Sequence, residues 1–253
     1  MIKIIYSETA KEAGKCAADI ISDLLKSKSD AVLGLATGSS PIGMYEELIS
    51  KYQQGEISFS GVRSVNLDEY VGLSADHDQS YSYFMHKNLF DHVDIKEGNT
   101  NLPNGLATDP KAECARYDSV VASMGGVDIQ VLGIGNNGHI GFNEPSDAFS
   151  VGTVLVDLTD STIDANSRFF ASRDDVPTQA ISMGVGQIMQ ARGIILLAMG
   201  KGKAEILEQS LFGPVTPKVP ASALQLFRGD VYVCADADAL SVISQRHPEA
   251  IIK

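Results

Sequence analysis

The sequence predicts a single α/β domain over residues 1–253, with a mostly parallel sheet that carries helices on both faces. Short apolar runs, typical of buried strands, alternate along the chain with segments whose apolar residues recur at helical spacing. No long linker rich in Pro, Gly or Ser and no internal repeat divides the chain. Because ligands bind beyond the carboxyl ends of the strands in such sheets, we expect the active site in those loops.

The expected elements follow in order from the N-terminus. An apolar strand at residues 1–7 precedes a helix at residues 9–27, which begins with the capping-box pattern Thr9-x-x-Glu12. The further expected strands cover residues 31–36, 62–70, 127–135, 153–158, 193–200 and 230–236. The further expected helices cover residues 42–52, 79–90 and 110–124.

Charge and hydropathy exclude several classes of function. The formal net charge is −12, from 20 Lys and Arg against 32 Asp and Glu, which argues against nucleic acid and against anionic membranes as partners. The longest apolar run, residues 194–199, is too short to cross a bilayer, and the N-terminus has no signal-peptide pattern. We therefore expect a cytoplasmic protein, and an anionic small substrate would need a locally positive pocket.

The three cysteines are Cys16, Cys114 and Cys234. They lie far apart in the sequence, are odd in number and include no C-x-x-C pair. We interpret them as small apolar residues without a disulfide or zinc framework.

The first strand-end loop, residues 34–43, reads GLATGSSPIG. Small residues let the backbone surround an anion, N–H groups at the start of the following helix point at it, and hydroxyls add donors. The alternative is a helix cap with a tight turn, and the loop by itself does not decide between them. No G-K-[ST] follows, so this is not a Walker A loop. The candidate anion-binding residues are Thr37, Gly38, Ser39 and Ser40.

Two adjacent carboxylates, Asp68 and Glu69, lie at the end of the strand at residues 62–70. Adjacent strand residues point to opposite faces, so only one of the two is expected to face a given pocket. A carboxylate in that position could act as a general base, and the alternative is a solvated acidic turn.

The loop at residues 133–145, GIGNNGHIGFNEP, begins with the dinucleotide-binding pattern G-x-G-x-x-G. That pattern must lead directly into a helix, and here Gly141 and Pro145 prevent one. We therefore reject a dinucleotide cofactor. A single His in such a turn is more often structural, but here His and a carboxylate cluster with Asn side chains, and this clustering favours proton transfer. These side chains are Asn136, Asn137, His139, Asn143 and Glu144.

Two cations follow strands in this acidic chain, namely Arg168 and Lys203. Both are natural partners for a phosphate. The alternative, solvated surface charges, remains open on the sequence alone.

Four stretches, in the same order, resemble motifs of the glucosamine-6-phosphate deaminase family. They are LGLATGSSP (33–41), NLDEYVGL (66–73), GNNGHIGFNEP (135–145) and ANSRFF (165–170). The resemblance extends from the first strand to about residue 240. It implies a modified Rossmann-like sheet and an enzyme that converts glucosamine 6-phosphate and water to fructose 6-phosphate and ammonium, without metal or redox cofactor.

The resemblance also implies roles for single residues. Asp68 resembles the base that moves a proton from C2 towards C1, His139 the ring-opening acid/base, and Glu144 the carboxylate that orients His139. Asn137 lies where many members have Asp and others have Asn, so it can orient His139 but supplies no charge. Residues 37–40, Arg168 and Lys203 resemble the phosphate-binding group, and the stretch around Arg168 resembles a mobile lid.

Long bacterial members of that family bind an activating sugar phosphate at a subunit interface rich in basic residues. This chain has no Lys or Arg between Pro145 and Arg168, and its tail after residue 240 is short, so we expect no such regulation. The competing interpretations are another sugar-phosphate enzyme of this fold, such as an isomerase or 6-phosphogluconolactonase, and a non-catalytic sugar-phosphate sensor. The sequence does not distinguish a monomer from a homo-oligomer.

Overall fold

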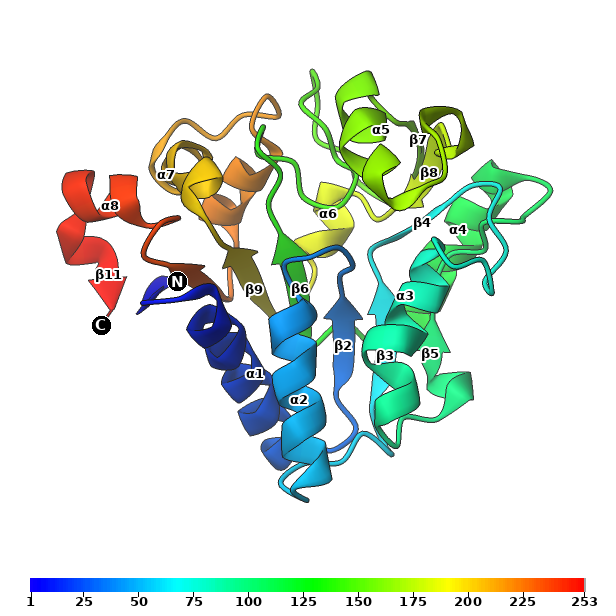
Figure 1. Ribbon diagram of the computed structural model, residues 1–253, viewed down its shortest axis with the longest axis horizontal. Coiled ribbons are helices and arrows are strands. Elements are labelled where there is room, and N and C mark those ends of the chain that lie inside the picture. Colours follow the sequence, from blue (N-terminus) through cyan, green and yellow to red (C-terminus); the bar gives the residue numbers. More distant parts are fainter. Residues whose placement is uncertain (253) are drawn as a thin grey trace.

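The computed structural model describes residues 1–252, and its centre is an eight-stranded sheet in which every neighbouring pair of strands is parallel (Figure 1). The strand order is β11-β1-β10-β9-β6-β2-β3-β5. The bounds are β1 Ile2–Ser7, β2 Val32–Leu35, β3 Arg63–Asn66, β5 Thr100–Asn101, β6 Ile129–Gly133, β9 Gly193–Ala198, β10 Asp230–Asp236 and β11 Ile251–Ile252. The predicted α/β class with a mostly parallel sheet is confirmed.

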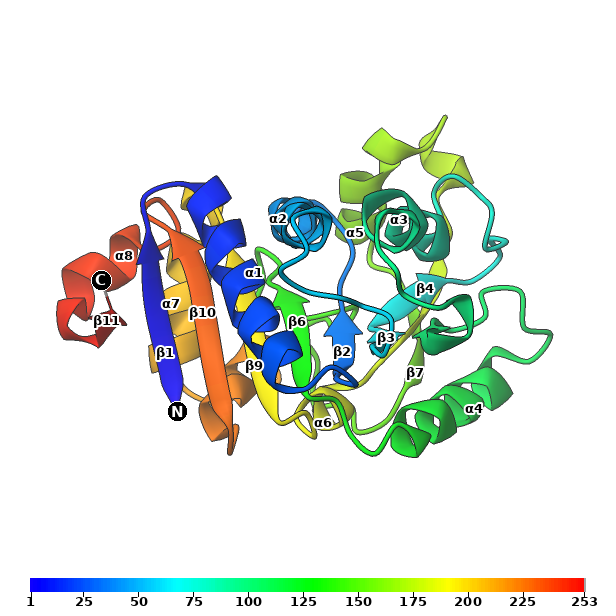
Figure 2. The same cartoon turned by 90° about the horizontal axis from the view of Figure 1, so that it is seen from below.

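Helices cover this sheet from both sides. Figure 2 shows α1, α2 and α3 along one face and α4 and α6 on the other. The bounds are α1 Ala10–Ser27, α2 Ile42–Gln53, α3 Tyr81–Asn88, α4 Pro110–Ser123, α5 Asp160–Asn166, α6 Val185–Ile188, α7 Ala204–Phe212 and α8 Ser241–Arg246. Within residues 1–252, every helix is too short or too polar to span a membrane.

Local sequence explains how these helices begin and which side they bury. Thr9 and Glu12 form both hydrogen bonds of the predicted capping box at the start of α1. The buried stripe of α1 consists mostly of small and branched apolar residues at helical spacing, which lets the helix approach the sheet closely. β9 is buried along its whole length, as expected for a central strand covered on both faces.

The predicted strand at residues 62–70 is wrong as a single strand. β3 ends at Asn66, and β4 (Asp68–Tyr70) belongs to a second, antiparallel sheet of order β4-β8-β7, with β7 at Val154–Asp157 and β8 at Gln179–Ser182. Leu67 is the junction, because its N–H donates to Leu35 of β2 (3.1 Å) and its carbonyl accepts from Met183 after β8 (2.7 Å). The predicted strand at residues 153–158 likewise belongs to this small sheet, and the short strands β5, β8 and β11 were not predicted.

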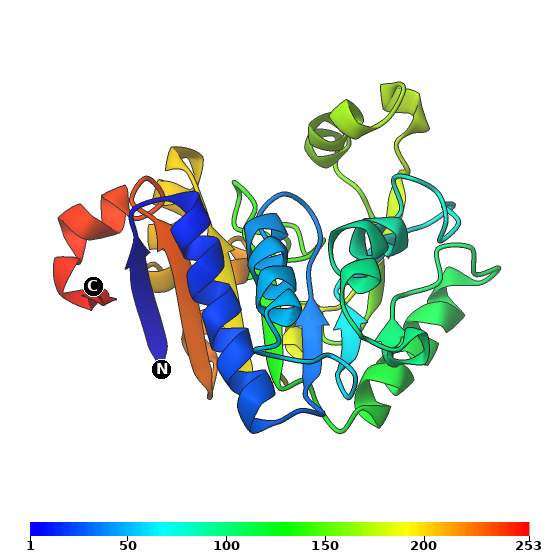
Figure 3. The ribbon, with the colours of Figure 1, turned by 60° about the horizontal axis from the view of Figure 1, so that its bottom comes forward.

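The segment between β7 and β8, which carries α5 and the 3-10 helices η3 (Ser167–Phe169) and η4 (Arg173–Asp175), projects above the carboxyl ends of the large sheet (Figure 3). Arg173 holds the segment together, since it contacts Asp160 and Asp164 at 2.6 Å each. A small apolar cluster lies at its base, where Phe170 meets Tyr70 edge-on with ring centroids 6.1 Å apart. We call residues 159–178 the projecting segment.

Candidate active site

A cavity of about 680 Å³ opens at the carboxyl ends of β2, β3 and β6, beneath the projecting segment. Its volume suits a small-molecule ligand. Nine predicted site residues line it: Thr37, Gly38, Ser39, Ser40, Asp68, Asn137, His139, Arg168 and Lys203. The tenth, Glu144, lies directly behind the wall, against His139.

The loop at residues 37–40 connects the end of β2 to the start of α2. Gly38 has φ +87°, a backbone conformation that favours glycine, and it lets the chain turn sharply into the helix. The Tyr45 hydroxyl donates to the Ala36 carbonyl at 2.7 Å and fixes the beginning of the loop. The loop therefore presents the hydroxyls of Thr37, Ser39 and Ser40 to the cavity directly before α2 begins, an arrangement that suits an anion.

Asp68 and Glu69 point to opposite sides of β4, as strand geometry predicts. Asp68 lines the cavity and is 6 % exposed. Burial raises the pKa of Asp68 to about 8, and the neighbouring Glu69 carboxylate adds to this effect. Neither residue forms the solvated acidic turn that was the alternative.

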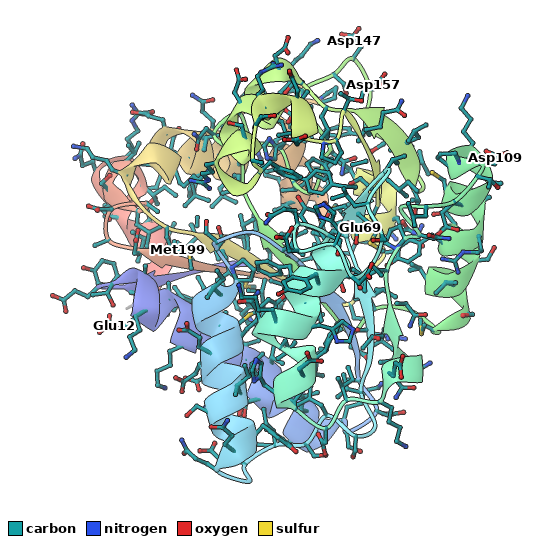
Figure 4. The ribbon with its side chains drawn as sticks, turned by 45° about the vertical axis from the view of Figure 1, so that its right-hand side comes forward. Glu12, Glu69, Asp109, Asp147, Asp157 and Met199 are labelled. Atoms are coloured by element: carbon teal, nitrogen blue, oxygen red, sulfur yellow. The ribbon has the colours of Figure 1, made fainter. Side chains whose placement is uncertain are left out.

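Glu69 instead serves the fold. Its carboxylate accepts from the backbone N–H groups of Tyr70, Tyr81 and Ser82, each at 2.9 Å, and the last two are the first residues of α3. Figure 4 labels Glu69 inside the molecule beside α3, whereas Asp147 and Asp157 lie at the outer edge. The carboxylate thus anchors α3 next to the strand that carries Asp68.

His139 and Glu144 lie against each other in the loop that follows β6. His139 Nδ1 lies 3.2 Å from Glu144 Oε1 but without the alignment of a hydrogen bond. Asn137 connects the two, because its amide donates to Glu144 Oε2 at 2.6 Å and its Oδ1 accepts from the His139 backbone N–H at 3.2 Å. Burial would raise the pKa of Glu144, but contacts with His139, Thr162 and Asn137 outweigh burial and lower it to about 2.

The glycines of residues 133–145 build a turn that places the His139 ring. The Gly135 N–H donates to the His139 carbonyl at 2.9 Å, and a Cβ on Gly135 would overlap the imidazole. Gly138 and Gly141 have φ of +84° and +55°, which L side chains rarely adopt. No helix follows, so the rejection of a dinucleotide loop agrees with the local structure.

Two cations reach the cavity from different elements. Lys203 ends the 3-10 helix η5 (Lys201–Lys203), and its Nζ donates to Asn136 Oδ1 at 2.6 Å. Burial lowers the pKa of Lys203. Arg168 comes from η3 of the projecting segment and is exposed. These side chains supply the locally positive surface that an anionic ligand needs in a chain of net charge −12.

Sequence reasoning missed two residues of the site. The Thr162 hydroxyl, from α5, donates to Glu144 Oε1 at 2.8 Å and links the projecting segment to the His139 pair. Tyr81, at the start of α3, also lines the cavity, and burial raises its pKa well above the ordinary value. Thr162 belongs to no motif and meets Glu144 only because the segment folds back. Tyr81 follows the predicted site strand closely, and a search of the next helix start could have found it.

One cavity thus combines a buried carboxylate, a histidine paired with a second carboxylate, and groups suited to a phosphate. Such a site can take a proton from carbon and move protons between oxygens on a small anionic molecule. Among residues 1–252, no group of three or more His, Cys, Asp or Glu side chains is arranged to hold a metal ion.

Comparison with known proteins gives consistent matches over nearly the whole chain. Residues 6–233 match the family described as glucosamine-6-phosphate isomerases/6-phosphogluconolactonase. The glucosamine-6-phosphate deaminase of Clostridium perfringens (strain 13 / Type A) is 52 % identical over 242 residues, covering 96 % of this chain and 100 % of that protein. The corresponding deaminase of Thermoanaerobacter sp. (strain X514) is 50 % identical, with 96 % and 95 % covered.

Solved structures agree with these sequence matches. A monomeric glucosamine-6-phosphate deaminase superposes with a TM-score of 0.91 at 45 % identity, covering 95 % of this chain and 99 % of that one. The 6-phosphogluconolactonase of Trypanosoma brucei superposes with a TM-score of 0.76 at 19 % identity, covering 98 % and 99 %. This second similarity shows a shared fold alone.

Proposed function

This chain belongs to the family of glucosamine-6-phosphate isomerases and 6-phosphogluconolactonases, and we propose that it is a glucosamine-6-phosphate deaminase. The reaction converts glucosamine 6-phosphate and water to fructose 6-phosphate and ammonium. The observation that carries the proposal is the buried carboxylate of Asp68 in the same cavity as His139 and the anion-binding loop. A sugar-phosphate sensor has no need for such a base.

His139 opens the sugar ring by moving a proton between the C1 hydroxyl and the ring oxygen. Glu144 stabilises the protonated imidazole. Asn137 positions Glu144 and His139 relative to each other through its two hydrogen bonds. The neutral amide of Asn137 is suited to this role, because it donates to a carboxylate that is already charged.

Asp68 then removes the proton from C2 of the open chain and delivers it to C1. The C2 ammonium group gives one proton to the C1 oxygen and becomes an iminium group, and water then adds to C2 and releases ammonium. A carbon-bound proton beside a carbonyl is weakly acidic, so a base whose pKa burial raises to about 8 is better matched to it than an ordinary aspartate.

The phosphate lies at the far end of the cavity, against residues 37–40, Lys203 and Arg168. Binding this remote group positions C1 and C2 beside Asp68 and His139. The projecting segment carries Arg168 and acts as a lid that keeps water from the reacting carbons. The protein works in the cytoplasm on a small-molecule amino sugar phosphate.

The experiment that tests this function measures ammonium and fructose 6-phosphate released from glucosamine 6-phosphate by the purified protein. We expect the two products in equal amounts. If the protein hydrolyses 6-phosphogluconolactone and releases no ammonium from glucosamine 6-phosphate, its function is that of a 6-phosphogluconolactonase and the proposed deaminase function is wrong. Tight binding of sugar phosphates with no product in either assay would instead indicate a sensor.

A further inference from the structure

A thiol pair far from the cavity has no part in the proposed reaction. Cys16 of α1 and Cys234 of β10 lie with their Sγ atoms 3.3 Å apart, although 218 positions separate them in the sequence. Figure 2 shows α1 lying along β10. A disulfide has an S–S length of about 2.05 Å, so the sulfurs need to approach by about 1.3 Å.

The surroundings give the two sulfurs different accessibility. Cys16 is half-buried, whereas Cys234 is fully buried in the sheet. The contact with Cys234 lowers the pKa of Cys16, while the same contact and burial raise the pKa of Cys234. Cys16 is therefore the sulfur that a solute can reach and the better nucleophile of the two.

We propose that Cys16 and Cys234 form a reversible disulfide, made by exchange with a low-molecular-weight disulfide, that fastens α1 to β10. In the first step the Cys16 thiolate attacks one sulfur of the small disulfide, which forms a mixed disulfide and releases one thiolate. Cys234 then attacks Cys16 Sγ and expels the second small thiol, which carries away the Cys234 proton. Two protein thiols are oxidised by two electrons, and one small disulfide is reduced to two thiols.

The expected consequence is stabilisation rather than loss of activity. Neither sulfur lines the cavity, and the cross-link joins the N-terminal and C-terminal parts of the chain. A disulfide that closes so long a loop restricts the unfolded chain strongly, and for a protein of this size we expect Tm to rise by roughly 4 to 16 °C.

Cys114 of α4 provides an internal control. It is buried, burial raises its pKa, and no other sulfur contacts it in the part of the chain that the structure describes. It should remain a free thiol under conditions that oxidise the Cys16–Cys234 pair.

The test incubates the folded protein with cystamine and follows intact mass, a non-reducing peptide map and Tm. We expect a product lighter by two hydrogen atoms, a linked Cys16–Cys234 peptide, a raised Tm, and full reversal by a reducing thiol. Cys114→Ser should behave like the original chain, Cys16→Ser should form no disulfide and show no rise in Tm, and Cys234→Ala should stop at a mixed disulfide on Cys16.

A mixed disulfide that persists on Cys16 of the original chain would overturn the proposal. So would preferential reaction of Cys114, or a Cys16–Cys234 link that forms only in denaturant. If Cys234→Ala does not fold, the peptide map of the original chain together with Cys16→Ser and Cys114→Ser still decides the question.

Discussion

Asp68 and Glu69 are neighbours in the sequence, yet their carboxylates have different surroundings in the fold. Three backbone N–H groups surround Glu69, while Asp68 faces the cavity and forms no hydrogen bond within the described residues. Burial and the Glu69 charge raise the pKa of Asp68 to about 8. Asp68, the proposed base, is therefore mostly protonated in the free protein at neutral pH.

This ionisation predicts a pH dependence of activity. We expect kcat/KM to rise about tenfold per pH unit below pH 8 and to level off above it, because only the carboxylate form of Asp68 accepts the C2 proton. Since the folded pKa is higher than the ordinary value of about 3.9, Asp68 also costs stability as pH rises from about 4 to 8. A flat kcat/KM profile between pH 6 and 9 would contradict this.

Asn137 predicts a second effect, on stability. In Asn137→Asp the amide donor to Glu144 Oε2 is replaced by a second carboxylate at hydrogen-bond distance. Loss of a hydrogen bond to a charged group costs about 1.5–3 kcal/mol, and like charges add to this, so Tm should fall at pH 7.

The pH dependence of that Tm difference provides the check. The stability that the low pKa of Glu144 confers is present above about pH 4 and is lost as pH falls towards 2. In Asn137→Asp, either the new carboxyl at position 137 or Glu144 takes up a proton as pH falls, and the protonated carboxyl can then donate a hydrogen bond to the other. A Tm difference that does not shrink between pH 7 and pH 4 would show that Asn137 does not act through Glu144.

At the scale of elements, α5 and the loop after β6 meet at one carboxylate oxygen. Glu144 Oε1 accepts from the Thr162 hydroxyl at 2.8 Å and also lies 3.2 Å from His139 Nδ1, which lacks an aligned partner. The proposed lid is therefore hydrogen-bonded to Glu144, the residue proposed to orient His139. Movement of α5 would change the contacts of the acid/base pair.

Removing the Thr162 hydroxyl tests that connection. Thr162→Val should favour the open lid and raise KM for glucosamine 6-phosphate by about tenfold, with a smaller change in kcat, because one charge-assisted hydrogen bond is lost. Thr162→Ser retains the hydroxyl and should behave like the original chain. Equal kinetics of the Val and Ser variants would show that the contact has no role in closure.

The elements also show what the sequence could and could not predict. Periodicity located α1, β2 and α2 correctly, because the two helices each bury one face and β2 is buried throughout, and the apolar run at the N-terminus located β1. Periodicity could not show that residues 62–70 form two strands, β3 and β4, because the junction at Leu67 depends on hydrogen-bond partners near two different sheets. The motifs indicated Asp68 and His139, whereas Thr162 and Tyr81 enter the site only through tertiary folding.

At the scale of the whole molecule, an acidic chain gathers cations at one end of a parallel sheet. The cavity has Lys203 and Arg168 beside the loop of residues 37–40, whereas the chain as a whole has a net charge of −12. This arrangement attracts a phosphate locally and disfavours large polyanions. Sequence composition predicted that the chain disfavours large polyanions. The local attraction for a phosphate depends on the fold, which brings residues 37–40, 168 and 203 together.

The molecule as a whole is also expected to lack allosteric activation. No Lys or Arg lies between Pro145 and Arg168, so this stretch lacks the basic residues expected of a site for an activating sugar phosphate. Initial rates should follow a hyperbola in glucosamine 6-phosphate, with or without N-acetylglucosamine 6-phosphate. Sigmoidal rates that this second sugar phosphate makes hyperbolic would refute the expectation.

The role of Asp68 as the base of a deaminase is tested most directly by ammonium release from Asp68→Asn, with Glu69→Gln as the matched control. We expect Asp68→Asn to lose turnover while it still binds the substrate and has an equal or higher Tm at pH 9. Glu69→Gln should retain measurable turnover but show a lower Tm, because it weakens the anchor of α3. Ammonium release from Asp68→Asn at the original rate would contradict the account.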